Sequence, residues 1–168
     1  MMNLGLKSTF PRLYNTVVKK QELIIEEVHI KADAEMGRVL VENLQGALPA
    51  IALYGHPALS TAYMNDCEPL LCFAQQVNGY GTANDVFLGI STSGNSKNVL
   101  YAAVTARAKG MKVIGLTGQK DSALSRMSDV CIQVPQTETY MSQELHLPIY
   151  HCLCLMLEES FFGNAFKT

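Results

Sequence analysis

The apolar positions of this chain form two kinds of pattern, and the two kinds alternate along it. Short apolar runs rich in β-branched and aromatic residues predict buried strands, and they fall at residues 49–54, 86–90, 111–116 and 130–134. Apolar residues spaced three or four apart predict helices, and they fall at residues 58–64, 70–77, 96–108, 122–127 and 142–161. Strands that alternate with helices predict an α/β fold, a three-layer sandwich with a parallel sheet flanked by helices.

Ahead of the first predicted strand, the spacing is mostly helical. Residues 10–45 carry apolar side chains at helical intervals, and Gly46 is a typical helix stop signal. The short run of Leu23, Ile24 and Ile25 fits either a helix or a strand, because periodicity does not separate the two in so short a segment. The length of 168 residues predicts a single domain, with a helical segment over 1–46 and the α/β core and final helix over 47–168.

Composition and charge narrow the class of protein. A net charge of −2 with 17% charged residues gives no basic surface for nucleic acid or an anionic membrane. No apolar stretch reaches the roughly 18 residues of a membrane helix, and the amino terminus lacks the apolar core of a signal sequence. The 5 cysteines, an odd number without a C-x-x-C pair, fit a reducing compartment. We therefore expect a cytoplasmic protein with no membrane and no direct nucleic-acid partner.

The stretch with the clearest chemistry follows the strand predicted at 86–90. The residues between that strand and the next helix are Ser91, Thr92, Ser93, Gly94, Asn95 and Ser96, here called the serine loop. The first N–H groups of a helix lack intrahelical acceptors and attract anions, the four hydroxyls add donors, and glycine lets the backbone come close. The loop therefore predicts a phosphate site, although it matches neither common nucleotide-binding motif. An ordinary turn capped by Ser96 is the alternative.

A family resemblance rests on this loop and on three later strings. In order they read L-G-I-S-T-S-G-N-S-K-N-V, A-R-A-K-G-M-K-V-I-G-L-T-G, S-D-V-C-I-Q-V-P and Q-E-L-H-L-P-I-Y-H. Together they resemble the sugar isomerase (SIS) domain family, most nearly its phosphoheptose isomerases and their relative, the initiator-associating protein. The resemblance implies a flavodoxin-like SIS fold, a sugar phosphate held by the serine loop, and catalytic roles for Gln143 and His151. Histidine suits the transfer of a proton between two sugar carbons, because it gains and loses a proton near neutral pH.

Two parts of the family's site differ in this chain. Where phosphoheptose isomerases have the loop G-N-G-G-S, residues 26–30 read E-E-V-H-I, which removes the glycines and adds two acids. Met36 and Leu40 stand where family members place a zinc-binding histidine and the catalytic glutamate. Neither side chain can replace such a ligand, so we expect no metal and no other cofactor.

These features leave two functions open. The first is isomerisation of a phosphorylated sugar such as sedoheptulose 7-phosphate, with His151 as acid and base and Gln143 orienting the substrate. Its second base would come from Glu35, Glu42 or a neighbouring subunit. The second function is a non-catalytic regulatory or interaction module, like the initiator-associating protein. The resemblance implies a homodimer or homotetramer in both cases, and His146, on another face of the predicted helix, is a candidate subunit contact.

Overall fold

The computed structural model describes residues 34–163 of the chain. These residues fall into two compact units, one of residues 51–152 and one whose described parts are residues 34–50 and 153–163. The expectations for residues 10–33, including the run of Leu23, Ile24 and Ile25 and the replaced glycine loop at 26–30, lie outside the described residues. The single domain expected from the length of the chain stays a prediction.

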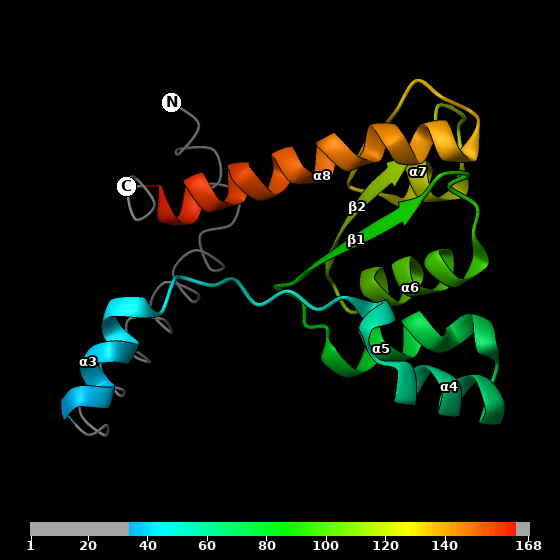
Figure 1. The fold of residues 1–168 in the computed structure, drawn as a ribbon. Helices are drawn as coiled ribbons and strands as arrows, with labels where there is room; N and C mark the ends of the chain where they lie inside the picture. The colour runs from blue at the N-terminus through cyan, green and yellow to red at the C-terminus, as the bar shows by residue number, and fades with distance from the viewer. Residues whose placement is uncertain (1–33, 164–168) are drawn as a thin grey trace. The chain divides into compact units, whose positions relative to one another are not determined.

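The unit of residues 51–152 is built on a parallel sheet (Figure 1). Its strands within the described residues are β1 Val86–Ser91, β2 Lys112–Thr117 and β3 Val130–Gln133, hydrogen-bonded in the order β1-β2-β3. Ser91 pairs with Thr117, and Thr117 pairs with Gln133, so all three strands end at the same edge of the sheet. The strands predicted at 86–90, 111–116 and 130–134 are confirmed.

Helices connect the strands and lie on both sides of the sheet (Figure 1). They are α4 Pro57–Asp66, α5 Cys72–Tyr80, α6 Lys97–Ala108, α7 Ala123–Met127 and α8 Thr139–Phe162, with 3-10 turns η1 Leu53–Gly55 and η2 Pro69–Leu71. Figure 1 shows α5 and α6 on one side of the sheet and the first turns of α8 on the other. The predicted α/β fold with a parallel sheet between helices is therefore confirmed.

The prediction of a strand at residues 49–54 is wrong. The segment contains no strand and ends in η1 Leu53–Gly55. Pro49 has no N–H to donate to a strand ladder, and Ile51 and Tyr54 remain 52% and 83% exposed. The apolar run therefore lacks both a pairing partner and a buried face among the described residues, and apolar content alone does not make a strand.

The core of this unit lies between the sheet, α5 and α6. Its buried apolar members are Val77, Phe87, Ala102, Ala103, Ala106, Met111, Val113 and Leu124. The alanines all belong to α6, and their small size lets this helix lie close to the strands. Gly89 of β1 faces the same layer, since a Cβ added there would stand 3.2 Å from Cγ1 of Val99. This packing fixes where α6 begins relative to the end of β1.

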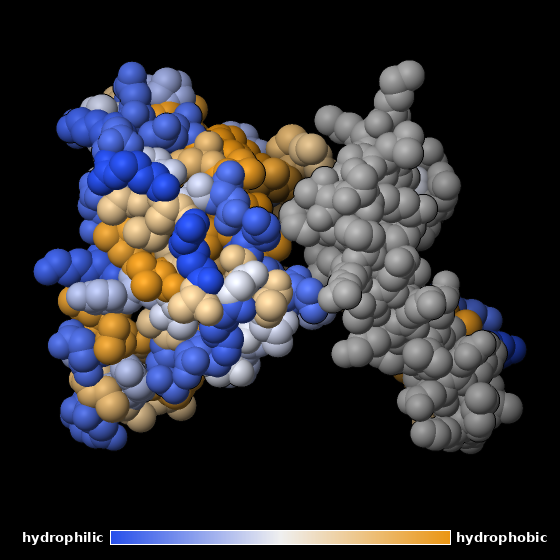
Figure 2. Space-filling model, turned by 180° about the vertical axis from the view of Figure 1, so that it is seen from behind, coloured by the Kyte–Doolittle hydropathy of each residue, from blue (hydrophilic) through white to orange (hydrophobic). Residues whose placement is uncertain are grey.

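The opposite face of β1 is open within the described residues. Val86, Leu88 and Ile90 point to that face and are 38%, 42% and 45% exposed. Figure 2, which views the molecule from behind, shows apolar residues in orange lying among hydrophilic ones in blue. On α8 the buried residues are Ser142 and His146, both polar. The start of α8 therefore buries polar side chains completely and apolar ones only in part.

In the other unit, α3 Ala34–Asn43 agrees with the helix predicted for this part of the chain. Its Met36 and Leu40 are 63% and 40% exposed. Gly46 lies after the end of this helix and against the ring of Phe162, where a Cβ would have no room. Among the described helices, none combines the length and the apolar character that crossing a membrane requires.

Candidate functional site

The serine loop turns the chain from the end of β1 into the start of α6. Gly94 has φ +63°, a left-handed conformation that side chains disfavour, and a Cβ there would collide with the side chain of Ser122. The N–H of Gly94 donates to the carbonyl of Ser91 at 2.9 Å, and its own carbonyl accepts the N–H of Leu124 at 3.0 Å. Glycine is thus required here so that the loop can close tightly against α7.

Asn95 holds the loop in shape through its side chain. Its Oδ1 accepts the N–H of Ala123 at 3.0 Å, and its Nδ2 donates to the carbonyl of Ser93 at 3.0 Å. The oxygen and the nitrogen of this amide are therefore both hydrogen-bonded within the protein, to the loop and to α7. These two bonds stabilise the loop, and a direct contact between Asn95 and a phosphate stays a prediction.

The hydroxyl groups and the first turn of α6 leave several donors unused. Buried Ser91 donates its hydroxyl to that of Ser96 at 3.0 Å. Ser96 is the N-cap residue of α6, but its side chain makes no capping hydrogen bond, unlike an ordinary N-cap serine. The N–H groups of Lys97 and Asn98 likewise have no acceptor among the described residues. Ser93 and Ser96 are exposed and Thr92 is half-buried, so an anion can reach this turn.

The turn that follows β2 borders the serine loop. The N–H of Gly118 donates to the carbonyl of Thr92 at 2.9 Å. A Cβ added to Gly118 would stand 2.7 Å from that carbonyl oxygen and 2.8 Å from the carbonyl oxygen of Gln136. Since Thr117 pairs with Ser91, the ends of β1 and β2 form one edge, which is where ligands bind in open α/β sheets.

A carboxylate near the serine loop, that of Asp121, is ion-paired. Asp121 precedes Ser122, the residue that touches Gly94, and binds the guanidinium of Arg126. The hydrogen bond from Arg126, followed by one from Ser125, holds the pKa of Asp121 below its ordinary value. The negative charge of Asp121 is thus offset close by, which reduces its repulsion of an anion at the loop.

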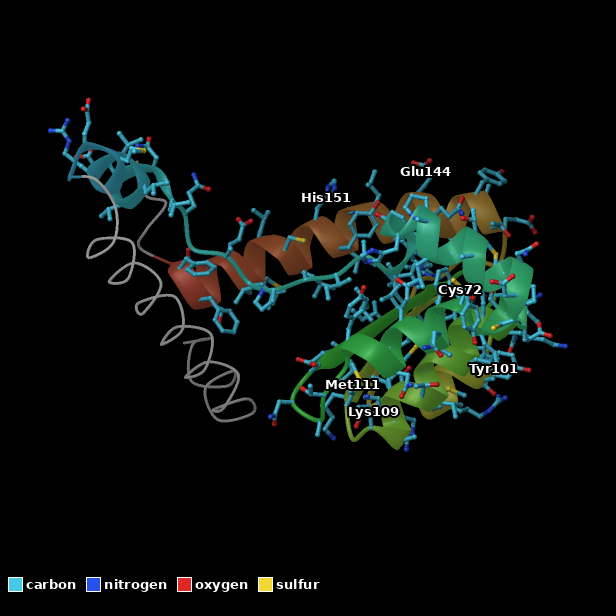
Figure 3. The ribbon with its side chains drawn as sticks, turned by 90° about the horizontal axis from the view of Figure 1, so that it is seen from below. Cys72, Tyr101, Lys109, Met111, Glu144 and His151 are labelled. Carbon is cyan, nitrogen blue, oxygen red and sulfur yellow. The ribbon has the colours of Figure 1, made fainter. Side chains whose placement is uncertain are left out.

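The two residues expected to be catalytic both lie on α8 and are exposed. Figure 3 shows His151 and Glu144 projecting to the same side of the helix. His146 instead is 2% exposed, with Nε2 3.2 Å from the carbonyl oxygen of Thr117. His151 lies five residues further on, about 140° around the helix axis, so it points away from the strand edge. Within residues 51–152, the structure does not bring His151 to the serine loop. Gln143 lies on α8 between the buried face, which carries His146, and the face that carries His151.

His146 is the residue of this region that the sequence placed wrongly. The sequence offers it as a candidate subunit contact, but its side chain is buried against the end of β2. The available signal was its spacing from Ser142: four residues apart on a helix is one face, and both are buried. Two polar residues on one face do not form the apolar stripe by which periodicity identifies the buried side of a helix.

Metal ligands do not gather in the part of the chain that the structure describes. Residues 34–163 contain no group of three His, Cys, Asp or Glu side chains able to hold a metal ion. Met36 and Leu40, which the family resemblance places at the ligand and glutamate positions, are exposed on α3.

The sequence profile of the SIS domain matches residues 46–156. The matched segment contains β1, the serine loop, α6 and most of α8. The chain therefore belongs to the SIS domain family.

Phosphoheptose isomerases are among its relatives. The enzyme of Aneurinibacillus thermoaerophilus is 40% identical over 121 residues, which are 72% of this chain and 61% of that protein. A solved structure from Francisella tularensis has TM-score 0.66 and 41% identity, covering 68% of this chain and 62% of that one. One from Neisseria gonorrhoeae has TM-score 0.63 and 31% identity, covering 91% and 92%. The chain thus spans about three fifths of the first two relatives and nearly all of the third in the structural match.

Proposed function

We propose that this chain binds a phosphorylated sugar through the serine loop, in the manner of a sugar-phosphate isomerase with part of its active site replaced. The observation that carries this proposal is the set of unused donors at the start of α6: the N–H groups of Lys97 and Asn98 and the hydroxyl of Ser96. A phosphate accepts several hydrogen bonds and carries the charge that a helix amino end favours. The Lys97 side chain adds a cation at the same turn.

The sugar to test first is sedoheptulose 7-phosphate. The relatives named phosphoheptose isomerase support this choice, because their names specify a phosphorylated seven-carbon sugar. The protein would meet such a metabolite in the cytoplasm. The rest of the sugar would extend from the loop toward Gln143, since Ser142, next to it, lies beside Gly118.

For isomerisation, we propose that His151 moves a proton between two sugar carbons and that Gln143 orients the substrate. Such transfer needs the acid and base groups within about 3 Å of the reacting atoms. Because His151 points away from the strand edge of its own chain, it would serve the loop of a neighbouring copy in a homodimer or homotetramer. The second base would be a carboxylate, and Leu40 does not supply one at the family's position.

The non-catalytic module remains the second candidate function. The observations that favour it are Leu40 and Met36 in place of the glutamate and the zinc-binding histidine, and the outward direction of His151. Such a protein would bind the sugar phosphate as a sensor or hold a partner protein without converting substrate.

The binding proposal is tested by calorimetric titration of the full chain with sedoheptulose 7-phosphate. We expect the double variant Ser93→Ala, Ser96→Ala to bind about tenfold more weakly or worse, since each hydrogen bond to a charged group contributes about 1.5–3 kcal/mol. Thr105→Ala is the matched control, because this hydroxyl lies on the same helix and binds only the carbonyl of Tyr101.

Two results would contradict the proposal. One is wild-type protein that does not bind the sugar phosphate at millimolar concentration. The other is a double variant whose affinity equals that of wild type and of Thr105→Ala, because the hydroxyls would then make no contact with the ligand.

A further inference from the structure

The buried face of α8 is polar where a helix of this length usually buries apolar side chains. Its buried residues are Ser142 and His146, 0% and 2% exposed and one helical turn apart. Burying polar groups costs free energy unless they are hydrogen-bonded. Both are: His146 Nε2 lies 3.2 Å from the carbonyl oxygen of Thr117, and Ser142 Oγ donates to the carbonyl of Gln136 at 3.3 Å. The fully buried contacts of the first turns of α8 are therefore polar.

His146 contacts the Thr117–Gly118 peptide, which in turn contacts the serine loop. A carbonyl oxygen only accepts hydrogen bonds, so Nε2 of His146 carries the proton and donates to Thr117. The same oxygen accepts the N–H of Val134 at 2.9 Å. The next N–H, that of Gly118, donates to the carbonyl of Thr92 inside the serine loop at 2.9 Å. One peptide unit therefore separates His146 from the loop.

This junction leaves little room for movement. A Cβ on Gly118 would stand 2.7 Å from the Thr92 carbonyl oxygen and 3.3 Å from Oγ of Ser142. The Gln136 carbonyl accepts both Ser142 and the N–H of Gln119, the latter at 2.9 Å. Tightly packed interiors transmit displacement, so a shift of the Thr117–Gly118 peptide moves Thr92 as well.

We propose that His146 is a positioning residue for the serine loop: by binding the Thr117 carbonyl it fixes the Gly118–Thr92 contact and thereby the geometry of the phosphate donors. His146 itself touches no ligand. The statement about ligand affinity rests on the proposed function, whereas the statement about the Gly118–Thr92 contact does not. A consequence is that α8, which also carries Gln143, is coupled to occupancy of the loop.

The first experiment needs no ligand. Amide hydrogen exchange is measured on the full chain for wild type and for His146→Leu, which keeps the side-chain volume but loses the donor. We expect faster exchange of the Gly118 N–H in the variant. Gln76→Leu is the matched control, because Gln76 is equally buried but bonds within α5 to Cys72, and its Gly118 exchange should equal that of wild type.

The second experiment is a double-mutant cycle of His146→Leu with Ser96→Ala, read as the Kd for sedoheptulose 7-phosphate. We expect His146→Leu to weaken binding about tenfold, because the ligand must then order a loop that is no longer held in its binding geometry. We expect Ser96→Ala to cost less in the His146→Leu background than alone. His146→Gln places an amide N–H where Nε2 stands and should restore affinity to within about threefold of wild type. A merely structural role would give additive effects and no rescue.

The outcomes separate the two proposals. Faster Gly118 exchange with no sugar-phosphate binding by wild type overturns the proposed function and supports the role of His146. Unchanged Gly118 exchange, or additive effects on Kd, overturns the role of His146 while the proposed function stands. If His146→Leu does not fold, His146→Asn, polar but too short to reach Thr117, is measured in the same way and is expected to behave as His146→Leu.

Discussion

At the scale of single residues, Gly94 is where the backbone of the site depends on one amino acid. Its φ of +63° and its contact with Ser122 leave no space for a side chain. We expect Gly94→Ala to lower the free energy of unfolding by about 2 kcal/mol or more, because the left-handed conformation alone costs about 1–2 kcal/mol and the collision adds to it. Denaturant unfolding followed by circular dichroism measures this.

The matched control at this scale is Gly79→Ala. Gly79 lies inside α5 and has nothing within 4 Å of an added Cβ. Alanine there should be neutral or should stabilise by up to about 1 kcal/mol, because glycine is a poor helix former. Equal stability of the Gly94 and Gly79 variants would show that the loop conformation is not strained by a side chain.

At the scale of elements, Asp129 joins β2 to β3. Its carboxylate accepts Lys112 Nζ and the N–H of Val113, each at 2.8 Å, and its own N–H donates to the Val113 carbonyl. The hydrogen bond from Lys112, and next that from Val113, holds the pKa of Asp129 below its ordinary value of 3.8. A carboxyl group whose pKa is lowered by folding stabilises the protein above its unfolded pKa and loses that effect as pH falls through the folded pKa.

We therefore expect Asp129→Asn to be less stable than wild type at pH 7 by a few degrees in Tm, with the difference shrinking as pH falls below about 3.8. Thermal unfolding between pH 7 and pH 3 measures it. Asp121→Asn is the comparison, since Asp121 is also ion-paired but bonds only to residues within α7 and its cap. A difference for Asp129→Asn that stays constant down to pH 3 would argue against a role for its ionised form.

The element scale also shows which secondary structure followed from the sequence. The apolar runs at β1, β2 and β3 and the helical spacing of α4 to α8 were predicted, because each pattern records which residues avoid water at the period of its element. The strand predicted at 49–54 does not form. A strand also requires a neighbouring strand to pair with, and the local sequence pattern does not show whether one is present. The structure starts α8 at Thr139, three residues before the predicted start.

At the scale of the whole molecule, the question is whether the chain turns over the sugar that it is proposed to bind. We expect isomerase activity on sedoheptulose 7-phosphate to be absent or very weak, because Leu40 supplies no carboxylate and His151 points away from the edge of its own sheet. The measurement is incorporation of deuterium at C1 or C2 during incubation in deuterated water, followed by nuclear magnetic resonance.

Exchange in wild type that disappears in His151→Ala would overturn this expectation and would identify His151 as the acid and base of a working isomerase. Binding without exchange would support the non-catalytic module. The full chain is used in both cases, so that any assembly of copies that brings His151 to a neighbouring loop is retained.

The sequence by itself determined the alternation of strands and helices, the serine loop between β1 and α6, and the family resemblance. All three depend only on residues that are close together in the sequence. Only the tertiary structure decided which α8 histidine is buried. His146 and His151 lie on the same helix, and their exposure depends on where Thr117, 29 positions from His146 in sequence, is placed. The tertiary structure also decided the hydrogen bonds of the Asn95 side chain. Its oxygen accepts the N–H of Ala123 at the start of α7, which the left-handed turn at Gly94 brings within reach. Periodicity records which side chains leave water; hydrogen-bond partners distant in sequence exist only once the chain has folded.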